Sequence, residues 1–306
     1  MFLSHRCLRN SRRRAPFLSI LKKQDYSTLP ATLRTSSDLD IGCYSVRHSA
    51  ALRIMDHHLH VSGIIPHSVS VDDGSERVDY LHDWYCVGQA VTCYPRKQLL
   101  LESLNCFDTI KSHVWVSSVG SGSSVTFGNA ITMKDSICLA SASRVFARTK
   151  ARKSAPFTDD ERQKLIQHHS LSSNVPIDFV NHPLPELKRL TEPPHNQLQE
   201  EPILKVWIGP QHINFADHVD HAFLAETASH ALFLSSFGNK TPAHNIVSHE
   251  KSLLPSTLSL NYRSPGMLGQ VVHCFIHDNA TFIYASGDNK RRDQHQLLLM
   301  AEMSKI

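Results

Sequence analysis

The stretches ERVDYLHDWYCVGQAV, residues 76–91, and DHVDHAFLAETASHAL, residues 217–232, decide the predicted fold because they resemble two copies of one helix. Aligned without gaps, both begin with an acid, and Val78 falls on Val219. Apolar side chains recur at helical spacing in both, and the small residues among them allow close packing against a sheet. The two stretches begin about one small domain apart, so the sequence predicts a duplicated unit built around a long helix.

Runs rich in β-branched and aromatic residues follow each predicted helix. Clusters of Gly, Pro, Asn and Asp separate them, as is typical of turns between strands. The runs are HVWVSS (113–118), SSVTFGNAI (123–131) and SICLASASRVFAR (136–148) after the first helix, and STLSLNY (256–262), GQVVHCFI (269–276) and ATFIYASG (280–287) after the second. Each unit is therefore predicted to be α+β, with a curved antiparallel sheet wrapped around one long central helix.

These elements divide the chain into a first domain at residues 40–153, a linker at 154–202 and a second domain at 203–306. The linker is rich in Pro and in charged residues. It contains one short predicted helix at 158–168, which Thr158 would cap and which has acids in its first turn.

Residues 1–35 are predicted to be a transit peptide that directs the protein to the mitochondrial matrix. Seven Arg and Lys residues precede Asp25, the first acidic residue, and apolar side chains lie between them. A secretory signal would have a longer uninterrupted apolar stretch. We expect cleavage somewhere between Tyr26 and Ser37; the alternative is a basic tail that binds nucleic acid or a membrane.

Composition argues against several classes of protein. The chain has 306 residues and a net charge of +4, but its basic N-terminal segment accounts for more than this excess. The remainder is slightly acidic, so no nucleic-acid partner is predicted. The 7 cysteines form no CxxC pair, which predicts reduced and mostly buried thiols. No stretch reaches the roughly 18 apolar residues of a membrane helix, so no integral membrane segment is predicted.

The segment INFADHVDHAFLAETA, residues 213–228, resembles the D-x-x-x-H-V-N-N-x-x-Y signature of hot-dog acyl thioesterases. The similarity is to the 4-hydroxybenzoyl-CoA and acyl-ACP thioesterase branches. His218 and Val219 stand for the His-Val of that signature, and Asp220 and His221 for its paired Asn. The strand runs of the first copy also resemble the central hairpin and the last strand of the family.

The resemblance covers most of residues 40–150 and 200–306 and implies a tandem double hot-dog fold, in which one chain mimics a hot-dog dimer. It implies an acyl thioester of CoA or of an acyl carrier protein as substrate, and it allows two such chains to form a homodimer. Neither a cofactor nor a metal is implied.

The chain departs from the signature at the catalytic aspartate, which in many members lies four residues before the His. Asn214 occupies that place in the second copy, and Asp73 is the aligned carboxylate of the first. A rival in the first copy is Asp56, which with His60 and Val61 fits the D-x-x-x-H-V spacing better but lies earlier than the helix alignment requires. Asp73 is preferred for this reason.

Thioester hydrolysis needs a carboxylate to activate water or attack the carbonyl carbon, and a donor for the oxyanion that develops. A helix N-terminus offers unpaired N–H groups and a positive dipole end. Asp73 is therefore predicted as the general base or nucleophile of the first copy. In the second copy Asn214, Asp217 and His218 would bind water or polarise the carbonyl, with Glu226 as a further carboxylate. The alternative is that these residues only cap helices or make structural hydrogen bonds.

A CoA substrate would need cations for its phosphates, and Arg144, Arg148 and Lys150 at the end of one strand run are predicted for this role. The alternative is a solvated, charged strand end. The 21 histidines show no HExxH pattern and no comparable third-ligand spacing, so no metal site is predicted. The sequence also lacks the G-x-S-x-G elbow of serine hydrolases.

The sequence and the resemblance together favour a mitochondrial thioesterase that hydrolyses fatty-acyl thioesters of CoA or of an acyl carrier protein. A second hypothesis is a hydratase of enoyl thioesters from another branch of the fold. A third is a non-catalytic double hot-dog protein that serves as an acyl-binding or assembly subunit of a mitochondrial complex.

Overall fold

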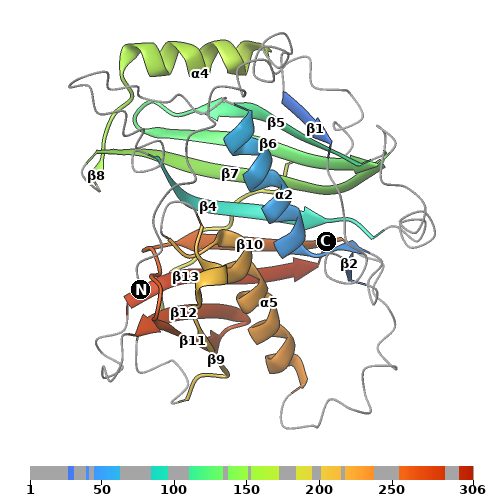
Figure 1. The fold of residues 1–306 in the computed structure, drawn as a ribbon, viewed down its shortest axis with the longest axis vertical. Coiled ribbons are helices and arrows are strands. Elements are labelled where there is room, and N and C mark those ends of the chain that lie inside the picture. Colours follow the sequence, from blue (N-terminus) through green and yellow to red (C-terminus); the bar gives the residue numbers. More distant parts are fainter. Residues whose placement is uncertain are drawn as a thin grey trace, which may run out of the picture.

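The structure, a computed structural model, is α+β, with two long helices lying on one face of a large antiparallel sheet (Figure 1). It describes residues 27–30, 39–40, 45–62, 84–95, 110–133, 137–150, 153–171, 184–194, 201–214, 218–237, 255–286 and 296–305. No described helix is both long enough and apolar enough to span a membrane.

Two halves of the chain supply the elements. The first half has β1 (Ser27–Pro30), α2 (His48–Val61), β4 (Trp84–Cys93), β5 (Ile110–Val119), β6 (Ser124–Met133) and β7 (Ile137–Lys150). The second half has β9 (Leu204–Trp207), α5 (His221–Phe237), β10 (Ser256–Tyr262), β11 (Val271–His277), β12 (Ala280–Ser286) and β13 (Gln296–Lys305). The shorter elements are β2 (Leu39–Asp40), β3 (Ser45–Val46), β8 (Lys153–Ser154), the helix α4 (Asp159–Leu171) and the 3-10 turn η6 (Pro210–His212).

The two halves share one topology. The strand order across the sheet is β1-β5-β6-β7-β4-β10-β13-β12-β11-β9. Numbered along the chain, the five main strands of the first half lie across the sheet in the order one, three, four, five, two. The five main strands of the second half continue in the reverse order: two, five, four, three, one. In both halves the long helix follows the first strand. The predicted duplication and the predicted fold class are therefore confirmed.

The halves meet where β4 pairs antiparallel with β10, a junction that we call the seam. Its register runs from Gly88 opposite Asn261 to Cys93 opposite Ser256. The helices α2 and α5 also contact each other over the seam, on one face of the sheet (Figure 1). The seam therefore joins both the sheet and the helical layer into one body.

The predicted helix at residues 76–91 is wrong. Residues 84–93 form the strand β4, and the earlier part of that stretch lies outside the described residues. Because β4 lies between β7 and β10 in the middle of the sheet, nearly all of its side chains are buried. Such a strand has no alternation of apolar and polar residues, so its apolar run resembles a helix in sequence.

The helix of the first half is α2, which the sequence alignment missed. Its buried side chains Ala51, Leu52, Met55 and Leu59 recur at helical spacing and face the sheet. The true counterpart of α5 is therefore α2, and the correct repeat begins earlier in the chain than residues 76–91.

The other predicted elements are confirmed. All six predicted strand runs form strands, and α5 covers most of the second predicted helix. The turn between β11 and β12 places Asp278 and Asn279 at positive φ values of 47° and 63°, as a tight hairpin requires. The predicted helix in the linker is α4, where Thr158 Oγ1 accepts the N–H of Glu161 and the Glu161 carboxylate accepts the N–H of Thr158.

Residues 184–194, which we call the strap, cross the seam on the face of the sheet opposite to the helices. Leu187 packs so closely on Gly88 that a Cβ there would lie 2.7 Å from Leu187 Cδ2. Leu190 contacts an outer apolar cluster that consists of Phe275, Ala280, Phe282, Tyr284 and Met300. The strap therefore covers apolar side chains that the helices cannot reach.

Candidate active site

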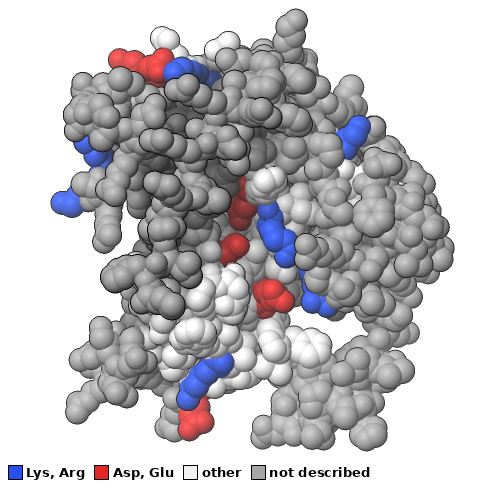
Figure 2. Space-filling model, in the orientation of Figure 1, with Lys and Arg blue, Asp and Glu red and all other residues white. Residues whose placement is uncertain are grey.

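Polar residues gather beneath the meeting point of α2 and α5, on the helical face of the seam. On this face, acidic and basic side chains of the described residues lie where the two helices approach each other (Figure 2). Arg144 on β7 and Gln89 on β4 are direct cross-strand neighbours. Arg144 Nε donates a hydrogen bond to Gln89 Oε1 at 3.0 Å, and Gln89 Nε2 donates to the hydroxyl of Tyr262 on β10. These hydrogen bonds join the two halves through side chains.

The guanidinium of Arg144 is neutralised by a carboxylate from the helical layer. Its Nη2 donates to Asp56 Oδ1 of α2, and the Arg144 side chain is 0% exposed. Burial alone would lower the pKa of Arg144, but the adjacent Asp56, together with Cys86 and Tyr262, outweighs burial and raises it. A guanidinium buried without a partner would be very costly, so Asp56 and Arg144 act as one unit.

Asp56 also faces the first residue of α5. Its Oδ2 lies 3.9 Å from Nδ1 of His221, which is an ion-pair distance and longer than a hydrogen bond. The His221 ring lies against the Tyr262 ring, with 4.4 Å between their centroids. The side chains of Asp56 and His221 are 20% and 25% exposed, so both can be reached from solvent. We call Asp56, Gln89, Arg144, His221 and Tyr262 the seam centre.

Asp220 begins α5 as its N-terminal cap. Its Oδ1 accepts the N–H of Ala222 at 2.8 Å, and its backbone carbonyl accepts the N–H of Leu224. Burial is the main cause that raises the pKa of Asp220, and nearby Asp56 adds to it. The cap fixes the direction in which α5 starts and therefore the position of His221.

The loop ahead of α5 is held by short-range hydrogen bonds. Asn214 Oδ1 accepts the N–H of His218 at 3.3 Å, and the N–H of Asn214 donates to the carbonyl of His218 at 2.8 Å. Val219 donates its N–H to the carbonyl of Gly266. The side chain of Asn214 is thus used to shape the loop in which the signature aspartate would stand.

The structure brings together only part of the predicted catalytic set. Asp56, the rival candidate, belongs to the seam centre, whereas Asp73 and Asp217 lie outside the described residues. Asn214 and His218 lie in the loop ahead of α5. Glu226, the predicted further carboxylate of the second copy, is exposed to solvent on α5 and is not part of the seam centre.

The predicted phosphate-binding cations have other surroundings. Arg144 is fully buried against Asp56, so the prediction that it contacts phosphate is wrong for this conformation. Arg148 is paired with Glu161 of α4 at 2.8 Å and also donates to the carbonyl of Pro156. Lys150 is exposed at the end of β7. The prediction for Arg144 failed because side chains alternate between the two faces of a strand, and the side chain of Arg144 points towards the helices.

Sequence reasoning did not assign Gln89, His221 or Tyr262 to catalysis. The sequence predicts His221 only in place of a signature Asn, and it predicts Gln89 on a helix where the structure has the strand β4. Among the described residues, no three His, Cys, Asp or Glu side chains are arranged to hold a metal ion. A polar residue inside an otherwise apolar central strand is the one sequence signal that could have marked Gln89 and Arg144.

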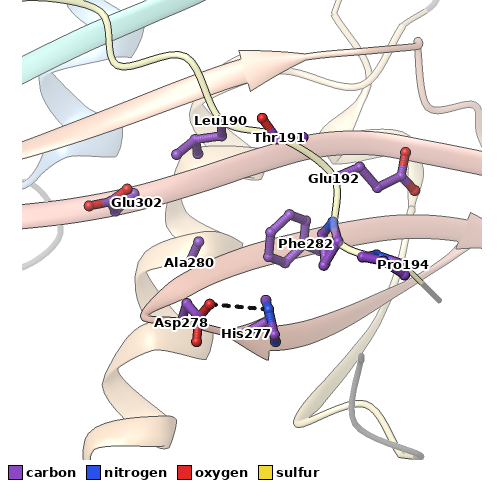
Figure 3. A pocket seen from close by; sticks show the side chains of 10 residues that line it. Leu190, Thr191, Glu192, Pro194, His277, Asp278, Ala280, Phe282 and Glu302 are labelled. Carbon is purple, nitrogen blue, oxygen red and sulfur yellow. Dashed lines mark ion pairs between the residues drawn. The ribbon is translucent and has the colours of Figure 1, made fainter. Parts of the chain in front are cut away.

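A hollow lies on the opposite face of the sheet. It has a volume of about 320 Å³ and is lined by the strap and by the β11–β12 hairpin (Figure 3). Phe282 lies at its floor, and His277 and Asp278 form an ion pair of 3.2 Å at its edge. Glu192 accepts a hydrogen bond from Tyr284, and Glu302 is paired with Lys188. Because its glutamates are engaged in holding the strap, we place the reactive site at the seam centre.

Comparison with known proteins supports the fold through structure alone. No protein-family model matches the sequence, and no curated protein sequence matches it either. Three solved thioesterase structures are similar over 92% of this chain. An acyl-ACP thioesterase from Bacteroides thetaiotaomicron has a TM-score of 0.52 at 11% identity, with 98% of that chain covered. An oleoyl thioesterase from Lactobacillus plantarum has a TM-score of 0.53 at 11% identity, with 96% covered.

The third structure is the 12:0-ACP thioesterase from Umbellularia californica, with a TM-score of 0.53 at 12% identity and 97% of that chain covered. In each case nearly the whole of both chains is aligned, so the likeness extends to the tandem arrangement of the two halves. The chain therefore has the double hot-dog, thioesterase-like fold that the sequence resemblance implied.

Proposed function

We propose that this protein hydrolyses fatty-acyl thioesters at the seam centre. The observation that carries the proposal is the approach of Asp56 from the first half to His221 from the second, at the N-terminus of α5. Both side chains are partly exposed, whereas the residues behind them are buried. The fold of three solved thioesterases supports the same class of reaction.

In the proposed reaction His221 acts as general base. Its imidazole takes a proton from a water molecule while the water oxygen attacks the thioester carbonyl carbon. Asp56 stabilises the imidazolium that forms. The oxyanion would lie near the start of α5, where the helix dipole favours negative charge. The C–S bond then breaks, and the thiolate takes the proton from the imidazolium, which leaves a carboxylic acid and a thiol.

The chain is proposed to contain a single such centre. On β4 and β7 the positions facing the helices include Gln89 and Arg144. On the corresponding strands β10 and β13, the described buried positions on that face include Leu258, Leu260, Leu299 and Ala301. The second half thus lacks a counterpart of the Gln89–Arg144 pair among its described residues, and the duplicated fold is asymmetric in its chemistry.

The substrate is proposed to be carried on CoA or on an acyl carrier protein, and the protein is proposed to act in the mitochondrial matrix. The pairing of β1 with β5 constrains the mature N-terminus. Cleavage after residue 35, as the predicted transit peptide of residues 1–35 implies, would remove β1, which begins at Ser27 and is part of the sheet. We therefore propose cleavage at the start of the predicted window, before Ser27. N-terminal sequencing of the mature protein tests this; a start after Pro30 would contradict it.

A thiol-release assay with a panel of acyl-CoAs of increasing chain length tests the activity. Wild type should release CoA from at least one substrate. His221→Gln should lower kcat by about 10²-fold or more, because general-base catalysis contributes about that much. The matched control is Glu226→Gln, which alters an exposed carboxylate on the same helix and should leave kcat unchanged.

The non-catalytic alternative has one supporting observation. Asn214 occupies the place of the signature aspartate and holds the loop with its side-chain oxygen. If no acyl-CoA and no acyl carrier protein thioester is cleaved while fatty-acyl thioesters still bind, the protein is an acyl-binding subunit and the hydrolase proposal is wrong.

A further inference from the structure

Arg144 occupies an unusual position for a charged side chain. Among the described Lys and Arg residues it is the one that is completely buried. Two of its nitrogens are engaged, Nε with Gln89 and Nη2 with Asp56, whereas Nη1 is buried and has no hydrogen-bond partner among the described residues. A buried donor without a partner is costly, and such costs persist mainly where the group serves a function.

We propose that Arg144 is a positioning residue for the hydrolysis proposed above: it holds the Asp56 carboxylate so that the second oxygen faces Nδ1 of His221. This inference rests on the proposed function. Asp56 Oδ1 is fixed by Arg144, and Oδ2 is thereby left to face His221 at 3.9 Å. A carboxylate that faces Nδ1 favours a proton on that nitrogen electrostatically, which leaves Nε2 as the proton acceptor.

The support for Arg144 comes from both halves of the chain. Gln89 holds Arg144 and is itself held to Tyr262, whose ring lies against His221. The contacts therefore form a closed ring from His221 through Asp56, Arg144, Gln89 and Tyr262 back to His221. Because this ring crosses the seam twice, the orientation of His221 depends on how the two halves are joined.

The other charged groups near His221 come from two elements. Asp220 precedes it and is held by the N–H of Ala222, and Arg53 of α2 is close enough to influence Asp220 electrostatically. Neither contacts Arg144 in the described structure. A change at Arg144 should therefore reach His221 through the ring, by way of Asp56 on one side and of Gln89 and Tyr262 on the other.

The experiment is nitrogen NMR of protein labelled with ¹⁵N-histidine, with the His221 signals assigned by their loss in His221→Gln. In wild type the neutral imidazole of His221 should carry its proton on Nδ1. In Arg144→Met it should become a mixture of both tautomers, and kcat should fall about 10²-fold with little change in KM, because a misplaced catalytic group costs about that factor. Arg144→Lys, which keeps the charge, should recover part of the loss.

Lys188→Met is the control, because it breaks an ion pair with Glu302 on the face of the sheet opposite to the helices, away from the seam centre. It should leave the His221 tautomer and kcat unchanged. A folded Arg144→Met protein with the wild-type His221 tautomer would overturn the proposal.

A double variant and a measurement without substrate complete the test. If Arg144→Met does not fold, Asp56→Leu combined with Arg144→Met replaces the buried guanidinium and its partly exposed carboxylate partner with apolar groups, a change that such ion pairs often tolerate. That variant should also lose the Nδ1 preference, and retention of it would overturn the proposal. Because the tautomer is measured without substrate, the positioning role is decided even if the wild type releases no thiol, in which case only the proposed reaction fails.

Discussion

Asn261 and Tyr262 are consecutive residues of β10 that serve opposite faces of the sheet. Asn261 holds the strap: its Nδ2 donates to the carbonyl of Lys188 at 2.9 Å, and its Oδ1 accepts the N–H of Leu190 at 3.5 Å. Tyr262 accepts a hydrogen bond from Gln89 in the seam centre. Two adjacent residues of β10 therefore have different roles: Asn261 holds the strap, and Tyr262 belongs to the seam centre.

Substitutions at these two positions should have different effects. Asn261→Ala removes two hydrogen bonds to the strap and should lower the free energy of unfolding by about 1–3 kcal/mol while leaving kcat unchanged. Tyr262→Phe removes the hydroxyl that holds Gln89 and should lower kcat. Urea denaturation and the thiol-release assay check both variants. Loss of kcat in Asn261→Ala at unchanged stability would show that the strap is part of the site.

Acid should destabilise the fold through His58. This residue is buried, with Nδ1 3.0 Å from Ser112 Oγ. Burial, aided by His113 and His57, lowers the pKa of His58 from 6.5 to about 3. The unfolded chain therefore takes up this proton at a higher pH than the folded chain, so stability is lost as pH falls below about 6.5 and the loss ends near pH 3.

Within that window the loss amounts to about 1.4 kcal/mol for each pH unit. Urea denaturation at several pH values measures it in wild type and in His58→Asn, which should have a shallower dependence. His230→Asn, on an exposed part of α5, is the control. An equally steep dependence in His58→Asn would show that other groups cause the acid loss.

The start of α4 should also contribute stability that depends on pH. Burial alone would raise the pKa of Glu161, but hydrogen bonds from Thr158 and Arg148 outweigh burial and lower it from 4.5. The contribution is therefore complete above about pH 4.5 and is lost as the pH falls through the lowered folded pKa. Thr158→Ala removes the cap and should cost about 1 kcal/mol near neutral pH, measured by thermal or urea unfolding. No change in stability would mean that α4 contributes nothing to the cooperative unit.

The described cysteines should be unreactive in the folded protein. Cys86, Cys93, Cys138 and Cys274 are buried and form no disulfide. Burial raises the pKa of Cys86 and of Cys274 to about 12, so little thiolate is present near neutral pH. Labelling with a thiol reagent followed by peptide mass spectrometry should modify these positions only after denaturation. Rapid labelling of Cys86 in the native state would show that the seam opens readily.

The sequence was sufficient for the fold class and for most strands, because runs such as residues 256–262 alternate in the way a half-buried strand does. It failed at β4, which is buried on both faces and so carries no alternation. That single error displaced the repeat and is the reason why Asp73 was preferred to Asp56 as the first-copy carboxylate. Local pattern cannot distinguish a fully buried strand from a buried helix segment.

The candidate site was harder to predict than the fold. Asp56 was a candidate only through motif spacing, yet it lies within α2 and not ahead of a helix. The ring that includes Gln89, Arg144 and Tyr262 forms because β4 pairs with both β7 and β10, and such long-range pairing has no local sequence signature. Arg144 was assigned to phosphate because the sequence does not show which face of β7 it occupies.

A double-mutant cycle between Asp56 and His221, measured as kcat/KM for the best acyl-CoA substrate, tests the central claim most directly. If the two residues act as one unit across the seam, each single variant, Asp56→Asn and His221→Gln, should lose about 10²-fold, and the double variant should lose little more than either alone. Losses that multiply in the double variant, or single variants that hydrolyse the substrate as fast as wild type, would contradict the account.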